Sequence, residues 1–187
     1  MTEVTVLGAG GNMGRRITRT LRDNPQYKLR LVEPGERGRS LIEESGLQVV
    51  DQAEGLAGTD VVVFAVPDKI VRGIAAEVIP LLDPGTSVLF LDPAAVAANR
   101  VPRRDDISCF VTHPTHPPLY SLLGEEDPAA RRDYWGGGLA TQAIVFAVAW
   151  GDEGRRPSSR TWRSTCSSRS PSPTASPSTR WRCSSRR

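Results

Sequence analysis

The sequence predicts an α/β fold, a doubly wound parallel sheet, over about residues 1–112. Short apolar runs alternate with amphipathic segments, and glycine or proline separates many of them. Strands and helices that alternate at this spacing form βαβ units with right-handed crossovers, which makes the sheet parallel. Continuous apolar runs also fit parallel strands, because helices cover both faces of such a sheet.

The expected elements follow in order along this part of the chain. Apolar runs predict strands at residues 4–7, 28–32, 60–66, 87–91 and 109–112, with a weak one at 49–50. Helical spacing predicts a helix from Met13 to Arg22 and a second one over 39–45, before Gly46. A third helix ends before Pro84 and carries four apolar residues on one face: Ile70, Ile74, Val78 and Leu81.

The pattern changes at residue 113. Three prolines in residues 113–118 predict neither strand nor helix, because proline lacks the N–H donor and restricts the residue before it. Residues 131–150 predict one long helix, which is strongly apolar from Leu139 onward. We therefore expect residues 113–153 to form a loop and the first helix of an α-helical second domain that is truncated.

Residues 154–187 differ from the rest in composition. From residue 155 onward only Arg, Pro, Ser, Thr, Trp, Cys and Ala occur. A disordered tail and an arginine-rich nucleic-acid-binding segment are two interpretations. We favour a third, translation of a GC-rich gene in the wrong frame, because a shifted reading of residues 160–167 and 178–186 gives amphipathic helical patterns. Sequencing the source DNA tests it.

The charge of the chain is unevenly distributed. The net charge is +3, but nine of the 24 basic residues lie in 155–187, which leaves residues 1–154 with a net charge of −6. We therefore expect no nucleic acid as a partner of the folded part. Three widely spaced cysteines predict neither disulfides nor a zinc site. The sequence shows neither a signal peptide nor a membrane-length apolar run. We therefore expect that the protein does not bind a membrane and that it is cytoplasmic.

A glycine-rich loop lies between the first strand and the first helix. Its pattern, GxGxxxG, gives a tight turn at Gly8 and a close backbone approach at Gly10, followed by helix-start N–H groups. This arrangement predicts a Rossmann-type site for the pyrophosphate of NAD or NADP. A glycine-rich turn without a ligand is the alternative. The residues expected at the cofactor are Gly8, Gly10, Gly11, Asn12, Met13 and Gly14.

Further cofactor contacts are expected at the ends of the later strands. Glu33, 23 residues beyond Gly10, would accept hydrogen bonds from ribose hydroxyls and repel a 2′-phosphate, which favours NAD. Arg37 and Arg39 could instead pair with that phosphate, so NADP remains possible, and a solvated loop acid is the other interpretation of Glu33. A nicotinamide pocket would use Val66, Pro67, Asp68 and Asp92, although Asp68 could equally cap a helix.

The only two histidines of the chain, His113 and His116, lie three residues apart after a predicted strand. Histidine accepts and returns protons near neutral pH, and a dehydrogenase must remove a hydroxyl proton as the hydride moves to nicotinamide. These residues are therefore the candidate catalytic pair. A metal site is a weaker interpretation, because no third ligand with suitable spacing follows, and a role in loop structure is also open.

Several motifs occur in one order after the glycine loop: Val66-Pro67-Asp68, Leu91-Asp92, His-Pro-Thr-His-Pro-Pro at 113–118 and Asp-Tyr-Trp-Gly-Gly at 133–137. Together they resemble the NAD(P)-dependent 6-phosphogluconate and β-hydroxyacid dehydrogenase-like family, which includes the D-apionate oxidoisomerases. The resemblance covers about residues 3–153. It implies a Rossmann domain, a helical domain that usually supports a homodimer, and a hydroxy-acid or sugar-acid substrate between them.

The resemblance also implies roles for individual residues. His113 and His116 would lie at the substrate, and Gln142 would be a catalytic residue. Two positions depart from the family pattern: Thr115 stands in place of an expected cysteine and Thr141 in place of an expected lysine. The alternative to an NAD(P)-dependent oxidoreductase is therefore a catalytically incomplete nucleotide-binding module that lacks its helical domain.

Overall fold

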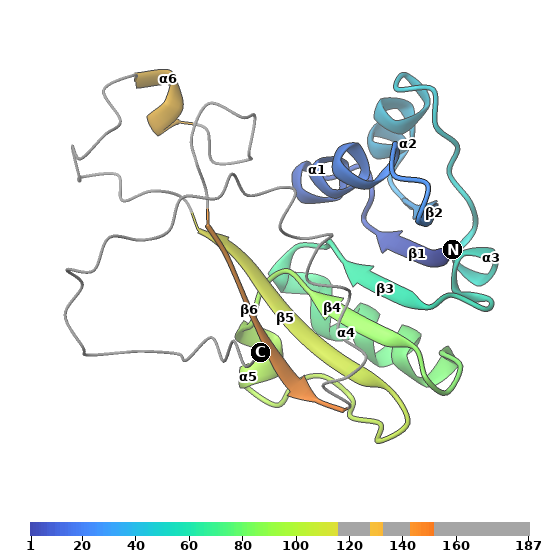
Figure 1. Ribbon diagram of the computed structural model, residues 1–187, viewed down its shortest axis with the longest axis vertical. Helices are drawn as coiled ribbons and strands as arrows, with labels where there is room; N and C mark the ends of the chain where they lie inside the picture. The colour runs from blue at the N-terminus through green and yellow to red at the C-terminus, as the bar shows by residue number, and fades with distance from the viewer. Residues whose placement is uncertain (116–127, 133–142, 152–187) are drawn as a thin grey trace.

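A six-stranded sheet forms the centre of the protein (Figure 1). The computed structural model describes residues 1–115, 128–132 and 143–151, and the statements below concern these residues. The strand order is β2-β1-β3-β4-β5-β6, with β6 antiparallel to β5 and the other pairs parallel. The strands are β1 (Thr2–Leu7), β2 (Tyr27–Val32), β3 (Val61–Phe64), β4 (Ser87–Phe90), β5 (Ser108–Thr115) and β6 (Ala143–Trp150).

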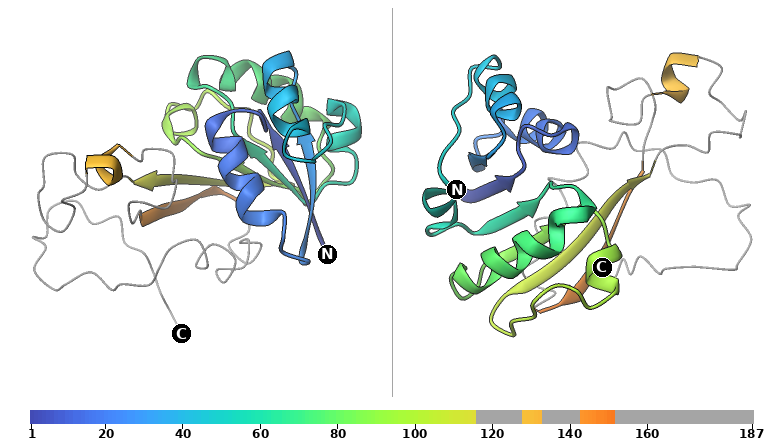
Figure 2. Two further views of the ribbon diagram at one scale, coloured as in Figure 1. Left: turned by 90° about the horizontal axis from the view of Figure 1, so that it is seen from above. Right: turned by 180° about the vertical axis from the view of Figure 1, so that it is seen from behind.

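Helices cover both faces of the sheet, as the turned views show (Figure 2). The helices are α1 (Asn12–Leu21), α2 (Glu36–Glu43), α3 (Gln52–Leu56), α4 (Asp68–Val78), the 3₁₀ turn η1 (Ile79–Leu81), α5 (Ala94–Ala97) and α6 (Pro128–Arg131). On one face α1 and α2 contribute Ile17, Leu21 and Ile42 to the core. On the other face α3 and α4 contribute Leu56 and Val71, so the layers are helix, sheet, helix.

Successive residues of the central strands enter opposite cores. In β3, Val62 and Phe64 belong to the core under α4, whereas Val63 belongs to the core under α1. Phe64 stacks on Phe90 of β4 with ring centroids 4.4 Å apart. Burial on both faces explains why these strands are continuous apolar runs. The predicted doubly wound Rossmann-type sheet is confirmed.

Two weaker predictions need adjustment. The expected strand at 49–50 is a single parallel bridge between Leu31 and Val49. In α4 the core-facing residues include Val71 and Ala75, whereas Ile70 is 48 % exposed. The helix is therefore rotated relative to the apolar face expected from the sequence. The short helices α3, α5 and α6 were not expected.

The prediction that residues from His113 onward leave the sheet is wrong. The strand β5 continues through Pro114 to Thr115 (Figure 1), while β4 pairs with it only as far as Val111. Beyond Val111 the strand has one neighbour, so the N–H that proline lacks is tolerated there as it is on an edge strand.

The prediction of one helix over 131–150 is also wrong. Residues Ala143–Trp150 form β6, which pairs antiparallel with β5. A continuously apolar run does not distinguish a strand from a buried helix, and its β-branched and aromatic residues suit a strand that pairs with an open sheet edge. The domain boundary at residue 112 stays a prediction. The 154–187 tail lies outside the described residues.

Candidate functional site

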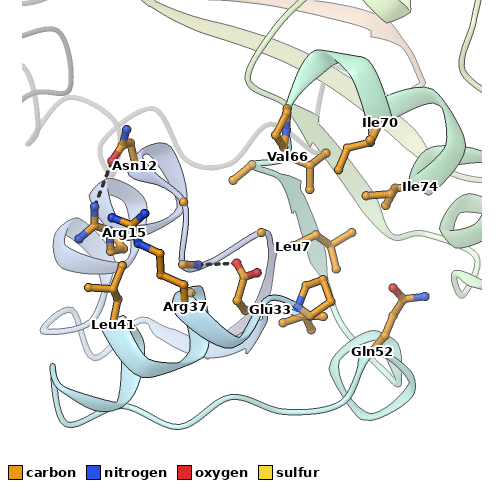
Figure 3. A pocket seen from close by; sticks show the side chains of 18 residues that line it. Leu7, Asn12, Arg15, Glu33, Arg37, Leu41, Gln52, Val66, Ile70 and Ile74 are labelled. Atoms are coloured by element: carbon orange, nitrogen blue, oxygen red, sulfur yellow. Dashed lines mark hydrogen bonds between the residues drawn. The ribbon is translucent and has the colours of Figure 1, made fainter.

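A cleft of about 510 Å³ opens at the carboxyl ends of β1, β2 and β3 (Figure 3). The glycine loop and the first turns of α1 and α2 form one wall, where Arg15, Arg37 and Leu41 lie. The opposite wall carries Ile70 and Ile74 of α4. The strand order changes direction at β1, and open α/β sheets bind ligands at such a crevice. The volume is in the range of small-molecule sites.

Backbone packing requires glycine at positions 8, 10 and 14 of the loop. Gly8 has φ of +76°, and a Cβ there would lie 2.7 Å from the Ala65 carbonyl oxygen. A Cβ on Gly14 would overlap the carbonyl oxygen of Gly8. The loop is fixed from below, because the N–H groups of Gly8 and Ala9 donate to the Val32 carbonyl at 2.9 and 3.2 Å. The loop therefore presents backbone to the cleft in one conformation.

The start of α1 supplies positive charge to this wall. The helix begins at Asn12 after Gly11, and no side chain of the described residues caps its first N–H groups. Uncapped N–H groups and the helix dipole favour an anion at this end. Arg15 donates to Asn12 Oδ1 at 3.0 Å, and its buried Nε has no hydrogen-bond partner among the described residues. The wall can therefore hold a phosphate or pyrophosphate group.

Glu33 reaches from the end of β2 to the glycine loop. Its Oε2 accepts a hydrogen bond from Gly10 N at 2.9 Å, and its Oε1 accepts one from Gly35 N at 2.9 Å. Both oxygens are thus held by backbone donors, and the half-buried carboxylate lines the cleft. Arg39 Nε donates to the backbone carbonyl of Glu33 at 2.8 Å, whereas Arg37 lines the cleft.

The apolar wall was not predicted from the sequence. Ile70 is 48 % exposed and lines the cleft with Ile74, as do Pro34 and Gln52. The signal that could have found it is an apolar residue in the first turn of a helix that follows a strand's carboxyl end.

The remaining predicted cofactor residues divide into two groups. Val66 and Pro67 line the cleft. Asp68 is the first residue of α4, with Pro67 at the N-cap and no side-chain cap, so the capping interpretation of Asp68 is wrong. Asp92 Oδ1 accepts a hydrogen bond from Ala94 N at 2.7 Å and holds the turn before α5. Four of the predicted cofactor residues do not line the cleft: Met13, Gly14, Asp68 and Asp92.

His113 lies near the carboxyl end of β5 and is exposed. Its Nδ1 is 3.3 Å from the carbonyl oxygen of Leu91, which precedes Asp92. Because a carbonyl can only accept, Nδ1 carries the proton in this contact, and the Nε2 of a neutral ring is left as an acceptor. His113 is therefore suited to take a proton. The other two predicted catalytic residues, His116 and Gln142, lie outside the described residues.

Cys109 offers no second reactive group. It is buried in the core below α4, and burial raises the pKa of its thiol to about 12. A thiol with this pKa does not form a thiolate nucleophile near neutral pH. Within the ranges that the structure describes, no cluster of three or more His, Cys, Asp or Glu side chains could hold a metal ion. Nor does any helix there have the length and apolar character to cross a membrane.

Known proteins match this chain at the level of family, sequence and structure. Residues 1–120 match the family described as the acetohydroxy acid isomeroreductase NADPH-binding domain. A protein of Cupriavidus necator named D-apionate oxidoisomerase is 44% identical over 152 residues, which are 81% of this chain and 54% of that protein. The predicted resemblance to dehydrogenases of this kind is confirmed.

Two solved structures agree. A crystal structure from Cupriavidus necator, described as a semialdehyde dehydrogenase NAD-binding protein in complex with calcium and NAD, has 43% identity and a TM-score of 0.71. The match covers 82% of this chain and 55% of that one. A putative oxidoreductase from Jannaschia gives 40% identity and a TM-score of 0.75, over 89% of this chain and 60% of that one. The chain thus spans about half the length of the curated relatives it matches.

Proposed function

Because the chain belongs to the family of the acetohydroxy acid isomeroreductase NADPH-binding domain, we propose that its cleft binds a nicotinamide dinucleotide for hydride transfer. The other reactant is a hydroxy acid or sugar acid, as the name of the D-apionate oxidoisomerase from Cupriavidus necator suggests. The residues present fit the cofactor: a loop whose glycines present backbone to the cleft, an uncapped helix start, and an apolar wall opposite.

The observation that carries the proposal is the hydrogen bond that Gly10 N donates to the Glu33 carboxylate. The pyrophosphate would lie on the N–H groups at the start of α1, and the adenine between Pro34 and the Ile70 wall. Glu33 would then accept hydrogen bonds from the ribose hydroxyls and repel a 2′-phosphate, so we favour NAD over NADP. Asn12 and Val66 are proposed as further contacts.

The bound nicotinamide supplies the hydride acceptor or donor, and the protein must handle the accompanying proton. His113 is the proposed base, because its Leu91 contact leaves Nε2 free to accept the hydroxyl proton. His113→Ala should lower turnover by about a hundredfold or more while the NAD dissociation constant stays within about twofold. Full turnover in this variant would remove the assignment. His116 and Gln142 remain proposals on the resemblance alone.

Thermal-shift titration with NAD, NADH, NADP and NADPH tests the binding proposal. At a hundred times its dissociation constant, a ligand that binds only the folded state adds about 2.7 kcal/mol to stability. We expect a clear rise in Tm with NAD and NADH and a smaller one with NADP and NADPH. A Tm that none of the four changes would contradict the proposed function.

A second candidate is a nucleotide-binding module without catalysis, in which Thr141 stands in place of the lysine that the resemblance implies. Hydride transfer to NAD with D-apionate as substrate separates the two candidates, since the module would bind NAD without turnover. A homodimer and a cytoplasmic location stay predictions, the first of which size-exclusion chromatography can check.

A further inference from the structure

Helix α2 contains a glycine where alanine would favour the helix. Gly38 lies in its first turn, and glycine is less favourable than alanine in a helix. A Cβ at this position would lie 2.5 Å from Cδ, 2.6 Å from Cγ and 2.9 Å from Oε2 of Glu33. All three atoms belong to one side chain, so the space that a larger residue would fill is occupied by Glu33.

Gly38 also touches the glycine loop directly. A Cβ on Gly10 would overlap the backbone of Gly38, so the two backbones are in close contact. The Glu33 carboxylate lies beside this contact, with Oε2 held by Gly10 N and Oε1 by Gly35 N, both at 2.9 Å. Each carboxylate oxygen can accept a further hydrogen bond. Two fixed acceptors side by side match a vicinal diol, such as the 2′- and 3′-hydroxyls of a ribose.

We propose that Gly38 is the positioning residue for cofactor selectivity, because its missing Cβ keeps the Glu33 carboxylate on the glycine loop. The inference rests on the proposed function, NAD binding in this cleft. An alanine at 38 would meet the flexible end of Glu33 rather than backbone. The protein would therefore fold, with the Glu33 side chain turned away from Gly10 N. The carboxylate would then no longer receive the ribose diol or exclude a 2′-phosphate.

The experiment compares Gly38→Ala with Gly73→Ala. Gly73 lies in α4, is exposed, and has nothing within 4 Å of its Cβ position, so it controls for a glycine-to-alanine change in a helix. Calorimetric titration gives the dissociation constants of NAD and NADP. We expect Gly38→Ala to weaken NAD about tenfold, the effect of one charge-assisted hydrogen bond, and to leave NADP binding equally strong or stronger, because the carboxylate no longer repels the 2′-phosphate. Gly73→Ala should change neither.

A double-mutant cycle tests whether Gly38 acts through Glu33. In a Glu33→Ala background, Gly38→Ala should change NAD affinity by about twofold or less, because the displaced carboxylate is already absent. An undiminished NAD loss in that background would overturn the proposal, as would an equal loss of NAD and NADP in the parent protein. Failure of Gly38→Ala to fold would also overturn it, since the overlap is assigned to a movable side chain.

The outcomes separate this inference from the function on which it rests. If the parent protein binds neither NAD nor NADP, the proposed function fails and the inference fails with it. If the parent binds NAD and Gly38→Ala binds it equally well, only the inference fails.

Discussion

Polar groups have opposite roles at the two ends of the parallel strands, the amino-terminal ends and the carboxyl-terminal ends. Toward the amino-terminal ends, polar side chains bind other parts of the fold. The buried Thr5 hydroxyl donates to the Gly55 carbonyl at 2.5 Å, and Glu3 forms ion pairs with Lys28 and Arg30. At the carboxyl-terminal ends, the N–H groups at the start of α1 have no side-chain cap. The contacts of Glu3 and Thr5 hold the fold together, whereas the start of α1 keeps backbone donors available for a ligand.

The same contrast holds for charged residues, and Arg104, which precedes β5, is an example at the amino-terminal ends of the strands. Arg104 donates to the carbonyls of Ile79 and Leu82, at 2.9 and 2.7 Å, and to both oxygens of Asp106. It thereby caps the end of η1 and ties it to the residues before β5. At the carboxyl-terminal ends, Arg37 and the half-exposed Ile70 line an open cleft. Mutations in the two regions should therefore separate stability from binding.

The largest expected effect is at Gly8. In Gly8→Ala the new Cβ would meet the Ala65 carbonyl at 2.7 Å in a backbone with φ of +76°. The loop must shift, so NAD affinity should fall about a hundredfold or more. Gly46→Ala is the matched control, because Gly46 has the same φ and nothing near its Cβ position. It should lower Tm and leave the NAD dissociation constant unchanged. Equal losses of NAD affinity in the two variants would contradict the assignment of the effect to the glycine loop.

The second largest effect is toward the amino-terminal ends of the strands, at Thr5. Thr5→Val keeps the shape of the side chain but leaves the buried carbonyl of Gly55 without its donor. Such a group costs about 1–3 kcal/mol of stability. Urea unfolding should show this loss, while NAD affinity stays within about twofold of the parent. A change in affinity as large as the change in stability would show that the two ends are coupled.

A smaller effect is expected at the cleft wall. Ile70→Ser removes apolar surface that is already half exposed in the free protein. Stability should change little, whereas NAD affinity should fall about fivefold, since covering the rest of the side chain is worth about 1 kcal/mol. Calorimetric titration measures this difference. A clear drop in Tm without a loss of affinity would instead place Ile70 in the core.

The smallest effect concerns acid stability at Asp106. The hydrogen bond from Arg104 lowers the pKa of this carboxyl, so its contribution to stability is present above the unfolded pKa and is lost as pH falls through the folded pKa. Asp106→Asn should therefore lower Tm slightly at pH 7. The difference from the parent should disappear once the pH is well below the ordinary aspartate pKa of 3.8. A difference that persisted at that pH would contradict the ionic origin.

The predicted residues that line the cleft depend on local patterns. The glycine loop and the acid at the end of β2 have fixed spacings, because the strand, turn and helix that use them are consecutive in the chain. The apolar wall was missed, because Ile70 follows the same helical spacing as a core residue. Only the rotation of α4 on the sheet determines whether such a side chain is covered or faces the cleft.

The sequence by itself determined the alternation of strands and helices, the place of the glycine loop, and the resemblance to nicotinamide-dependent enzymes. Periodicity and turn residues are local, so these features follow from neighbouring positions. The tertiary structure alone decided that residues 143–150 form the strand β6, because β5 offers backbone groups that need partners and lie 28 or more positions earlier. It alone decided that Gly10 N donates to the Glu33 carboxylate and that this side chain fills the Cβ position of Gly38. The glycine loop, the end of β2 and the start of α2 must meet for these contacts to form.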